Sequence, residues 1–303
     1  MDVYPYYTSY AFVGVGDFGE RLVREFLDPA SVHKISRVSI ITRHSPDTYA
    51  RLYQQKAEIV GDVDYDDQDA LVAALYGHQV VVSTFSNCIA VEAAVNQRAF
   101  ILAAKRAGVQ LFVLSEFGIE FDLSRCPPGQ GPTFQILKNQ ARALAEEIGL
   151  PWLSIQAGLF DIFLCLPEFV LDADACIARI LGNGDRRFPI SAQSDVASFT
   201  HAALTSGRLS PTALHYTSLR TQSAFLSWIE IVEAMEIEHG RPWTIRNGCV
   251  DEARAWVAEG VNLDDGRLGA WFQLEIEVGA LENGENDNAR VGFVPRVRVE
   301  DMF

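Results

Sequence analysis

The stretch YAFVGVGDFGERLVREFL, residues 10–27, contains the strongest indication of the architecture of this chain. It begins with an apolar, β-prone run, continues through the turn GVGDFG (14–19) and ends in residues with helical apolar spacing. In such a turn the first glycine allows a tight bend, the second lets the backbone approach a pyrophosphate, and the third lets the helix pack against the strand. The pattern therefore predicts a dinucleotide site. The predicted contacts from this turn are Gly14, Gly16, Asp17, Phe18 and Gly19.

Asp17 is the residue of this turn that suits a phosphate least, because its carboxylate would repel the anion. Either its side chain faces solvent, or the turn binds phosphate weakly. A tight turn without any ligand is the alternative for the whole motif. The strand before the turn and the helix after it favour the dinucleotide site.

Five further apolar runs alternate with segments of helical period. The runs span 37–43, 57–62, 79–85, 109–116 and 151–158. Two of the helical segments, 88–108 and 133–149, end in glycine, as helices often do. The alternation predicts an α/β fold with a Rossmann-type doubly wound parallel sheet.

The second half of the chain has a less regular pattern, although 223–240 predicts a helix. We expect residues 1–158 to form a nucleotide-binding domain, with a returning segment near 186–222. Residues 159–303 would form mainly a smaller α/β lobe for the substrate. Ligands of doubly wound folds lie beyond the carboxyl ends of the strands, so this lobe would close over that edge.

Composition restricts the class of partner. The 303 residues carry a formal charge of −15, which argues against nucleic acid and anionic membranes, because both bind basic surfaces. Five scattered cysteines without metal spacing favour a reducing compartment. No signal peptide or apolar run of membrane-spanning length is evident, so we expect a cytoplasmic protein, a monomer or a homodimer. The six histidines are isolated, and no metal site is predicted.

The second predicted strand ends in TRHS (42–45), where folds that bind NAD place an acidic residue for the ribose 2′-hydroxyl. Arg43 offers a planar fork for the 2′-phosphate of NADP(H), and no acid at this position would repel that phosphate. We predict that Arg43 and His44 contact the cofactor. The alternative is a solvated arginine at the end of a strand.

Several stretches resemble the isoflavone-reductase-like, or NmrA-like, branch of the atypical short-chain dehydrogenases. The resemblance covers most of the chain and includes the glycine turn, the strand ending in Arg43 and a later segment, 182–204, in which Asp195 precedes a helix. Three longer stretches also match: AEIVGDVDYDDQDALVAALYGHQVVVSTFS (57–86), QRAFILAAKRAGVQLFVLSEFG (97–118) and KNQARALAEEIGLPWLSIQAGLF (138–160). The last two, which contain the SEFG block and the lysine-bearing helix, are the most specific.

The resemblance implies an NADP(H)-binding Rossmann domain and a small C-terminal lobe. It implies cofactor contacts from two further segments and from the family's active-site lysine. These residues are Thr84, Phe85, Ser86, Ser115, Glu116, Phe117 and Lys138.

Lys138 lies in the predicted helix 133–149, where a lysine is ordinarily a solvated surface residue. The resemblance instead implies that Lys138 is the catalytic acid or base. Classical short-chain dehydrogenases have a tyrosine four residues before this lysine, and here that residue is Phe134.

Aromatic residues are candidates for a pocket that accepts a flat, apolar substrate, although core packing is their commoner role. The predicted substrate contacts are Phe117, Gly118, Phe160 and Phe163, and Trp271 is a weaker candidate.

Three hypotheses of function follow. The first is an NADPH-dependent reductase of a small aromatic or polyketide-like metabolite, in secondary metabolism, with Lys138 as acid or base. The second is a non-catalytic NADP(H)-binding regulator. The third is an isomerase, dehydratase or cyclase that uses the same fold without net redox chemistry.

Overall fold

Seven parallel strands form the main sheet of the computed structural model, in the order β11-β6-β5-β4-β1-β2-β3. The structure describes residues 7–28, 35–49, 56–85, 91–119, 132–164, 170–258, 266–282 and 284–302. The strands are β1 (Ser9–Val13), β2 (Arg37–Ile41), β3 (Glu58–Val60), β4 (Val80–Ser83), β5 (Leu111–Val113), β6 (Trp152–Gln156) and β11 (Thr217–Arg220). All six predicted runs contain one of these strands. The seventh strand, β11, was not predicted.

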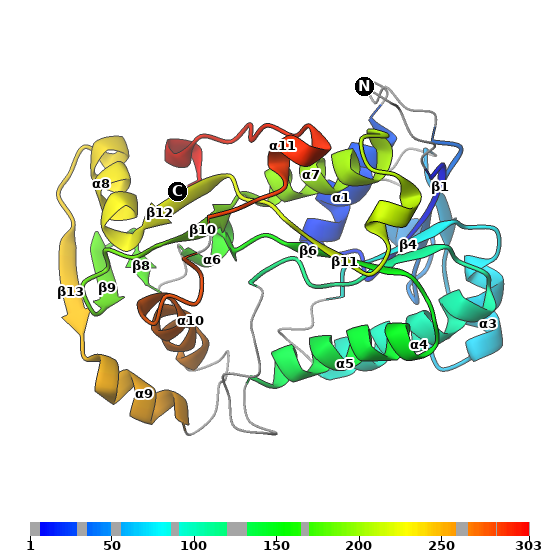
Figure 1. Cartoon of the computed structure of the whole chain (residues 1–303), viewed down its shortest axis with the longest axis horizontal. Coiled ribbons are helices and arrows are strands. Elements are labelled where there is room, and N and C mark those ends of the chain that lie inside the picture. Colours follow the sequence, from blue (N-terminus) through cyan, green and yellow to red (C-terminus); the bar gives the residue numbers. More distant parts are fainter. Residues whose placement is uncertain are drawn as a thin grey trace.

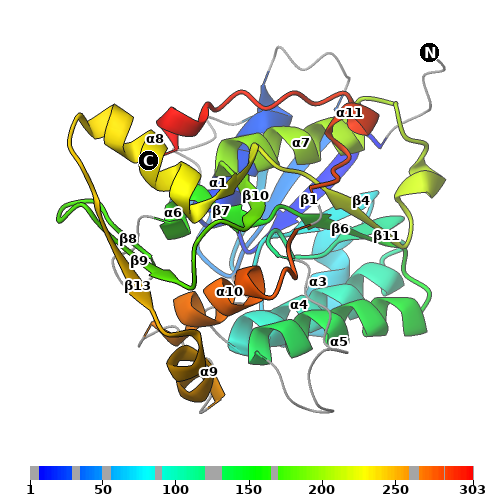
Figure 2. The same ribbon diagram turned by 60° about the vertical axis from the view of Figure 1, so that its left-hand side comes forward.

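Helices cover both faces of this sheet (Figure 1). One face carries α1 (Asp17–Leu27), α7 (Gln193–Thr205) and α11 (Asn288–Val291). The opposite face carries α3 (Gln68–Leu75), α4 (Val91–Arg106) and α5 (Thr133–Glu147). Figure 2 shows the same two layers from another direction. The prediction of a doubly wound α/β fold is therefore confirmed.

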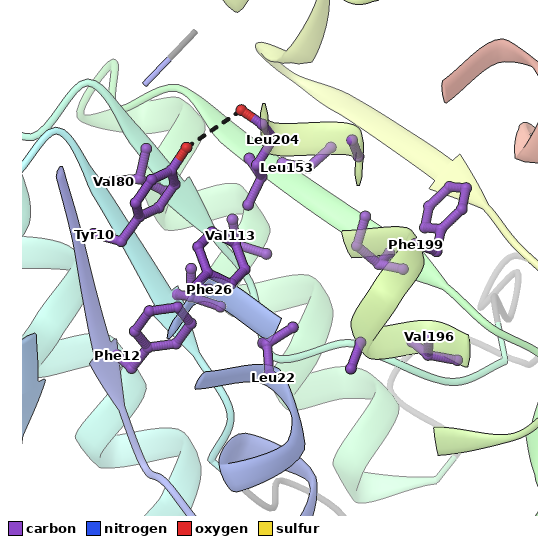
Figure 3. Close-up of a cluster of buried hydrophobic side chains, with 14 of the residues drawn as sticks. Tyr10, Phe12, Leu22, Phe26, Val80, Val113, Leu153, Val196, Phe199 and Leu204 are labelled. Atoms are coloured by element: carbon purple, nitrogen blue, oxygen red, sulfur yellow. Dashed lines mark hydrogen bonds between the residues drawn. The ribbon is translucent and has the colours of Figure 1, made fainter. Parts of the chain in front are cut away.

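The alternation of side chains along β1 explains why both faces are covered. Tyr10 and Phe12 point into the core beneath α1 and α7, whereas Ala11 and Val13 belong to the core on the opposite face. Figure 3 shows the first of these cores, in which the Tyr10 hydroxyl donates a hydrogen bond to the Leu204 carbonyl. A strand that is apolar on both sides is stable only between two layers of helix.

Two three-stranded sheets and their helices form the later part of the chain. The first sheet has the order β12-β10-β7 and the second the order β13-β9-β8. Their strands are β7 (Leu159–Phe160), β8 (Leu171–Asp172), β9 (Ile177–Leu181), β10 (Arg187–Ser191), β12 (Ala224–Ser227) and β13 (Thr244–Gly248). The accompanying helices are α6 (Asp161–Leu164), α8 (Trp228–His239), α9 (Val250–Ala258) and α10 (Arg267–Glu277), and two 3₁₀ turns span Pro211–Leu214 and Val299–Asp301.

The predicted helix 223–240 is wrong in its first turn. Residues Ala224–Ser227 form β12, which pairs with β10, and α8 begins only at Trp228. Ser227 caps the helix, because its hydroxyl accepts the backbone N–H of Glu230 while the Glu230 carboxylate accepts the N–H of Ser227. The capping box marks the boundary that apolar spacing alone did not show.

None of the helices within the described ranges combines the length and the apolar character that a membrane span requires.

Candidate functional site

The glycine turn after β1 rests on the end of β4. Gly14 has a φ of +70°, and a Cβ built there would lie 2.6 Å from the ring of Phe85 and 2.8 Å from its backbone nitrogen. A Cβ on Gly19 would lie 2.6 Å from the Thr84 hydroxyl oxygen. A side chain at either position would therefore separate the turn from the sheet. The turn, Thr84 and Phe85 are brought together, whereas Ser86 lies outside the described residues.

Gly16 differs from these two glycines because it faces open space. Apart from its neighbours in the chain, no atom of the described residues lies within 4 Å of the position that its Cβ would occupy, and Gly16 is the N-cap of α1 without a side-chain hydrogen bond to it. The backbone N–H groups in the first turn of a helix bind phosphate well. A pyrophosphate therefore fits this cradle, and Asp17 in the first turn is exposed.

A tyrosine that was not predicted braces the same turn. The Tyr49 hydroxyl donates a 2.9 Å hydrogen bond to the carbonyl of Val15, and the tyrosine ring is buried. Tyr49 is separated from the turn by the whole of β2, so no local sequence pattern indicates this contact.

Arg43 lies just past the end of β2, where the sequence places it, and it is exposed. Its Nη1 atom donates to the Glu92 carboxylate in the first turn of α4, at 2.5 Å. This hydrogen bond, with the attraction between the two charges, raises the pKa of the Arg43 guanidinium. His44 is also exposed, and its backbone N–H donates to the Thr42 hydroxyl. Glu92 was not predicted as a partner of Arg43.

Two segments that the resemblance placed along the cofactor are joined to each other. The Ser115 hydroxyl donates to the carbonyl of Phe85 at 2.6 Å, and the Ser115 N–H donates to the buried side chain of Gln97 at 2.8 Å. The Thr84 hydroxyl in turn donates to the carbonyl of Gly14 at 2.9 Å. The glycine turn and the ends of β4 and β5 therefore form one hydrogen-bonded edge.

Lys138 is a buried lysine, with 6% of its surface exposed, and not a surface residue of α5. Its Nζ atom donates a 2.7 Å hydrogen bond to the backbone carbonyl of Glu116. Nζ also lies 6.0 Å from the centre of the Phe134 ring, and it would lie 3.9 Å from a Cβ on Gly118. The structure thus places Lys138 at the segment 115–118 that follows β5.

The carboxylate of Glu116 holds that segment in place. Glu116 is 4% exposed, and its Oε2 atom accepts hydrogen bonds from three side chains. The donors are Arg142 at 2.5 Å, Ser154 at 2.9 Å and Gln156 at 2.7 Å. Arg142 lies one turn beyond Lys138 on the same face of α5, so the helix holds both the backbone and the side chain of Glu116.

Sequence reasoning missed these three partners of Glu116. Two signals could have found them: the four-residue spacing of Lys138 and Arg142, and the polar residues Ser154 and Gln156 within an otherwise apolar strand. Polar side chains on a fully buried strand need partners in the core.

The predicted aromatic residues form a cluster over the glycine turn. The ring of Phe18 lies 4.8 Å from that of Phe117 and 5.4 Å from that of Phe160, measured between ring centres. Phe117 and Phe160 are buried, Phe163 is partly buried, and all three pack against the core beneath α1 and α7. Trp271 belongs to the second core cluster, against which Phe163 also packs, and it contacts Phe134 at 5.6 Å between ring centres.

Asp195 ties the start of α7 to the C-terminal segment. Its carboxylate is buried and accepts hydrogen bonds from the Ser223 hydroxyl and from the backbone N–H groups of Arg296 and Val297. Its contacts connect distant segments of the chain and include none of the predicted site residues.

A groove of about 700 Å³ lies elsewhere in the later part of the chain, lined by residues that include Asp185, Arg187 and Glu277. Its described lining residues include none of the predicted site residues. Within the described ranges, no group of three or more His, Cys, Asp or Glu side chains is arranged to hold a metal ion.

A family model identifies the family, and the solved structures show the same fold. The model of the NmrA-like family matches residues 11–252. An isoflavone reductase of Cicer arietinum is 25% identical over 254 residues, which cover 82% of this chain and 76% of that protein. Among solved structures, the complex of leucoanthocyanidin reductase with NADPH from Vitis vinifera superposes with a TM-score of 0.73 at 22% identity, covering 91% of this chain and 89% of the other. The structure of AtPrR2 with NADP⁺ and (+)-pinoresinol has a TM-score of 0.73 at 19% identity, covering 93% and 91%.

Proposed function

Because the chain belongs to the NmrA-like family, we propose that it is an NADPH-dependent reductase of a small aromatic or polyketide-like metabolite. The family resemblance seen in the sequence is confirmed. The similar proteins support the proposal in general terms, since they include an isoflavone reductase and a leucoanthocyanidin reductase complexed with NADPH. The observation that carries the proposal is the buried lysine, Lys138, held beside the edge that contains the glycine turn.

In this proposal the glycine turn holds the pyrophosphate of NADP(H), with Gly16 providing the open approach and the first turn of α1 the N–H donors. Arg43 and His44 contact the adenosine ribose, and the segments 84–86 and 115–117 extend along the dinucleotide. NADPH, when bound, supplies the hydride.

Lys138 supplies or holds a proton at the substrate oxygen. An ammonium group has three donors and no acceptor, and one of the donors of Nζ is used on the Glu116 carbonyl. The remaining donors are available to orient or protonate a substrate oxygen. The hydrogen bond to Glu116 fixes Nζ in place, so the lysine needs little reorganisation when the substrate binds.

The substrate contacts that we propose are Phe117, Gly118, Phe160 and Phe163. Gly118 has no side chain to separate a ligand from Nζ, and the aromatic rings near the glycine turn suit a flat, apolar molecule. We assign residues 1–158 and the returning segment near 186–222 to cofactor binding, and most of residues 159–303 to the substrate lobe. The returning segment contains α7, which packs on α1, and β11, which pairs with β6.

The proposal is tested by incubating the protein with NADPH and a panel of enones, quinones and phenolic ethers, and by following cofactor oxidation and product formation. At least one substrate should be reduced with one NADPH consumed per product. Tight binding of both redox forms without turnover on any substrate would favour a regulator. Product formation after complete removal of the cofactor would favour an isomerase, dehydratase or cyclase.

A further inference from the structure

A carboxylate stands beside Arg43, although the sequence around β2 has none. The segment TRHS (42–45) lacks an acidic residue, and the sequence therefore predicts an unopposed site for a 2′-phosphate. Glu92 comes from the first turn of α4, 49 residues later, and its carboxylate oxygen lies 2.5 Å from Nη1 of Arg43. The fold thus places a carboxylate from a distant segment at the end of β2, where the local sequence has no acidic residue.

The two side chains have opposite preferences for the ribose of the cofactor. An arginine at this edge binds a 2′-phosphate, whereas an acidic residue accepts a hydrogen bond from a 2′-hydroxyl and repels a phosphate. Both side chains are accessible, since Arg43 is 52% and Glu92 is 62% exposed. Either one can therefore reach a ligand that binds at the end of β2.

The ion pair itself does not prevent binding. Exposed ion pairs contribute little to stability, and a guanidinium has five N–H donors, so Arg43 can contact a phosphate with Glu92 still beside it. The carboxylate then remains within a few ångströms of a phosphate that carries nearly two negative charges. The repulsion weakens the binding of NADP(H), whereas NAD(H) has no 2′-phosphate to be repelled and offers a 2′-hydroxyl that the carboxylate can accept.

We infer that Glu92 is a specificity residue of this chain. Arg43 alone would favour NADP(H) over NAD(H), and Glu92 reduces that preference. This inference rests on the proposed function, because it requires that a dinucleotide binds at the glycine turn. Glu92 tunes the choice between the two cofactors and contributes nothing to the chemistry at Lys138.

The test is calorimetric titration of the wild type and of Glu92→Gln with NADP⁺ and with NAD⁺. The chain offers a matched control in Asp69, which lies in the first turn of α3 and pairs with Arg106, also at 2.5 Å and also exposed. Asp69→Asn, like Glu92→Gln, removes one negative charge from the second residue of a helix. The partner of Asp69, Arg106, lies at the C-terminal end of α4, whereas Glu92 lies at its N-terminal end. Effects of net charge and of the helix dipole are thereby matched.

In Glu92→Gln, the affinity for NADP⁺ should rise roughly three- to tenfold, because a doubly charged phosphate loses a neighbouring charge. The affinity for NAD⁺ should stay constant or fall, so the ratio of the two affinities widens. The difference from the wild type should shrink in about 1 M salt, where the Debye length of about 3 Å is comparable to the distance between the two groups and the exposed carboxylate is partly screened. Asp69→Asn should leave the ratio unchanged.

A ratio that changes no more in Glu92→Gln than in Asp69→Asn, in a protein that binds NADP⁺, would overturn the inference and leave the proposed function intact. A wild type that binds neither NADP⁺ nor NAD⁺ would instead overturn the proposed function, and the inference with it.

Discussion

Two ion pairs at the carboxyl edge of the same sheet have the same length and opposite surroundings. In the first, the buried pair, the partly buried Arg142 of α5 donates at 2.5 Å to the fully buried carboxylate of Glu116, which follows β5. In the second, the exposed pair, Arg43 after β2 and Glu92 of α4 are joined at 2.5 Å with both side chains exposed to solvent. The buried carboxylate takes two further hydrogen bonds and fixes the backbone that holds Lys138. The exposed pair can separate or accept a third group at little cost. Because of this difference in burial, the first pair fixes the segment beside Lys138, and the second affects only the preference between NADP(H) and NAD(H).

Removing the lysine that the buried pair positions should have the largest effect. Lys138→Ala should lower kcat for any substrate of the panel by roughly 10²- to 10⁴-fold, the usual contribution of a general acid or base. Lys105→Ala is the control, because Lys105 is an exposed lysine at the end of α4 whose Nζ also donates to a backbone carbonyl, that of Gly149. An unchanged kcat in Lys138→Ala would remove Lys138 from the mechanism.

Breaking the buried pair should lower the stability of the protein. Glu116→Ala leaves Arg142, Ser154 and Gln156 without their shared acceptor, and should lower the free energy of unfolding by about 3 kcal/mol. Urea denaturation measures this loss. Glu116→Gln keeps an acceptor oxygen and should lose less, and equal losses in the two variants would show that the side-chain network does not hold the segment.

In the glycine turn, which lies between the two pairs, one glycine is needed for stability and another for ligand binding. Gly14→Ala should lower the free energy of unfolding by about 2 kcal/mol, because of its positive φ and the clash with Phe85. Gly16→Ala should leave stability nearly unchanged, since within the described ranges its Cβ would meet no atom beyond its chain neighbours, but it should weaken dinucleotide binding. Thermal unfolding and cofactor titration of both variants distinguish the two outcomes, and equal losses of stability would contradict the assignment.

Removing the exposed pair should have the smallest effect on the fold. Arg43→Ala should change the free energy of unfolding by less than about 0.5 kcal/mol. Its affinity for NADP⁺ should fall roughly tenfold, about 1.4 kcal/mol, with little change for NAD⁺. A large loss of stability in Arg43→Ala would mean that the exposed pair, like the buried pair, stabilises the fold.

The sequence predicts well what depends on neighbouring residues. Strand and helix periods located the six strands β1–β6, and glycine spacing located the turn that the structure places on Thr84 and Phe85. The boundary at Ser227 was missed because its capping box lies inside a continuous apolar pattern. The sequence contains both Ser227 and Glu230, but it does not show that they pair.

Contacts between distant segments could not be predicted in the same way. Glu92 meets Arg43 only because α4 begins near the end of β2, and Ser154 and Gln156 meet Glu116 only because β6 lies beside β5. No local spacing encodes these neighbours. The prediction of an unopposed 2′-phosphate site therefore missed its opposing charge, although the position of Arg43 was correct.

In the function that we propose, the glycine turn and Arg43 together bind NADP(H) beside Lys138. A calorimetric titration of the unmodified protein with NADPH, at about 0.15 M salt, tests it most directly. We expect saturable heat with one site per chain and an affinity in the micromolar range or tighter, on the order of what such enzymes need. A titration without heat, repeated at two temperatures to exclude a binding enthalpy near zero, would contradict it.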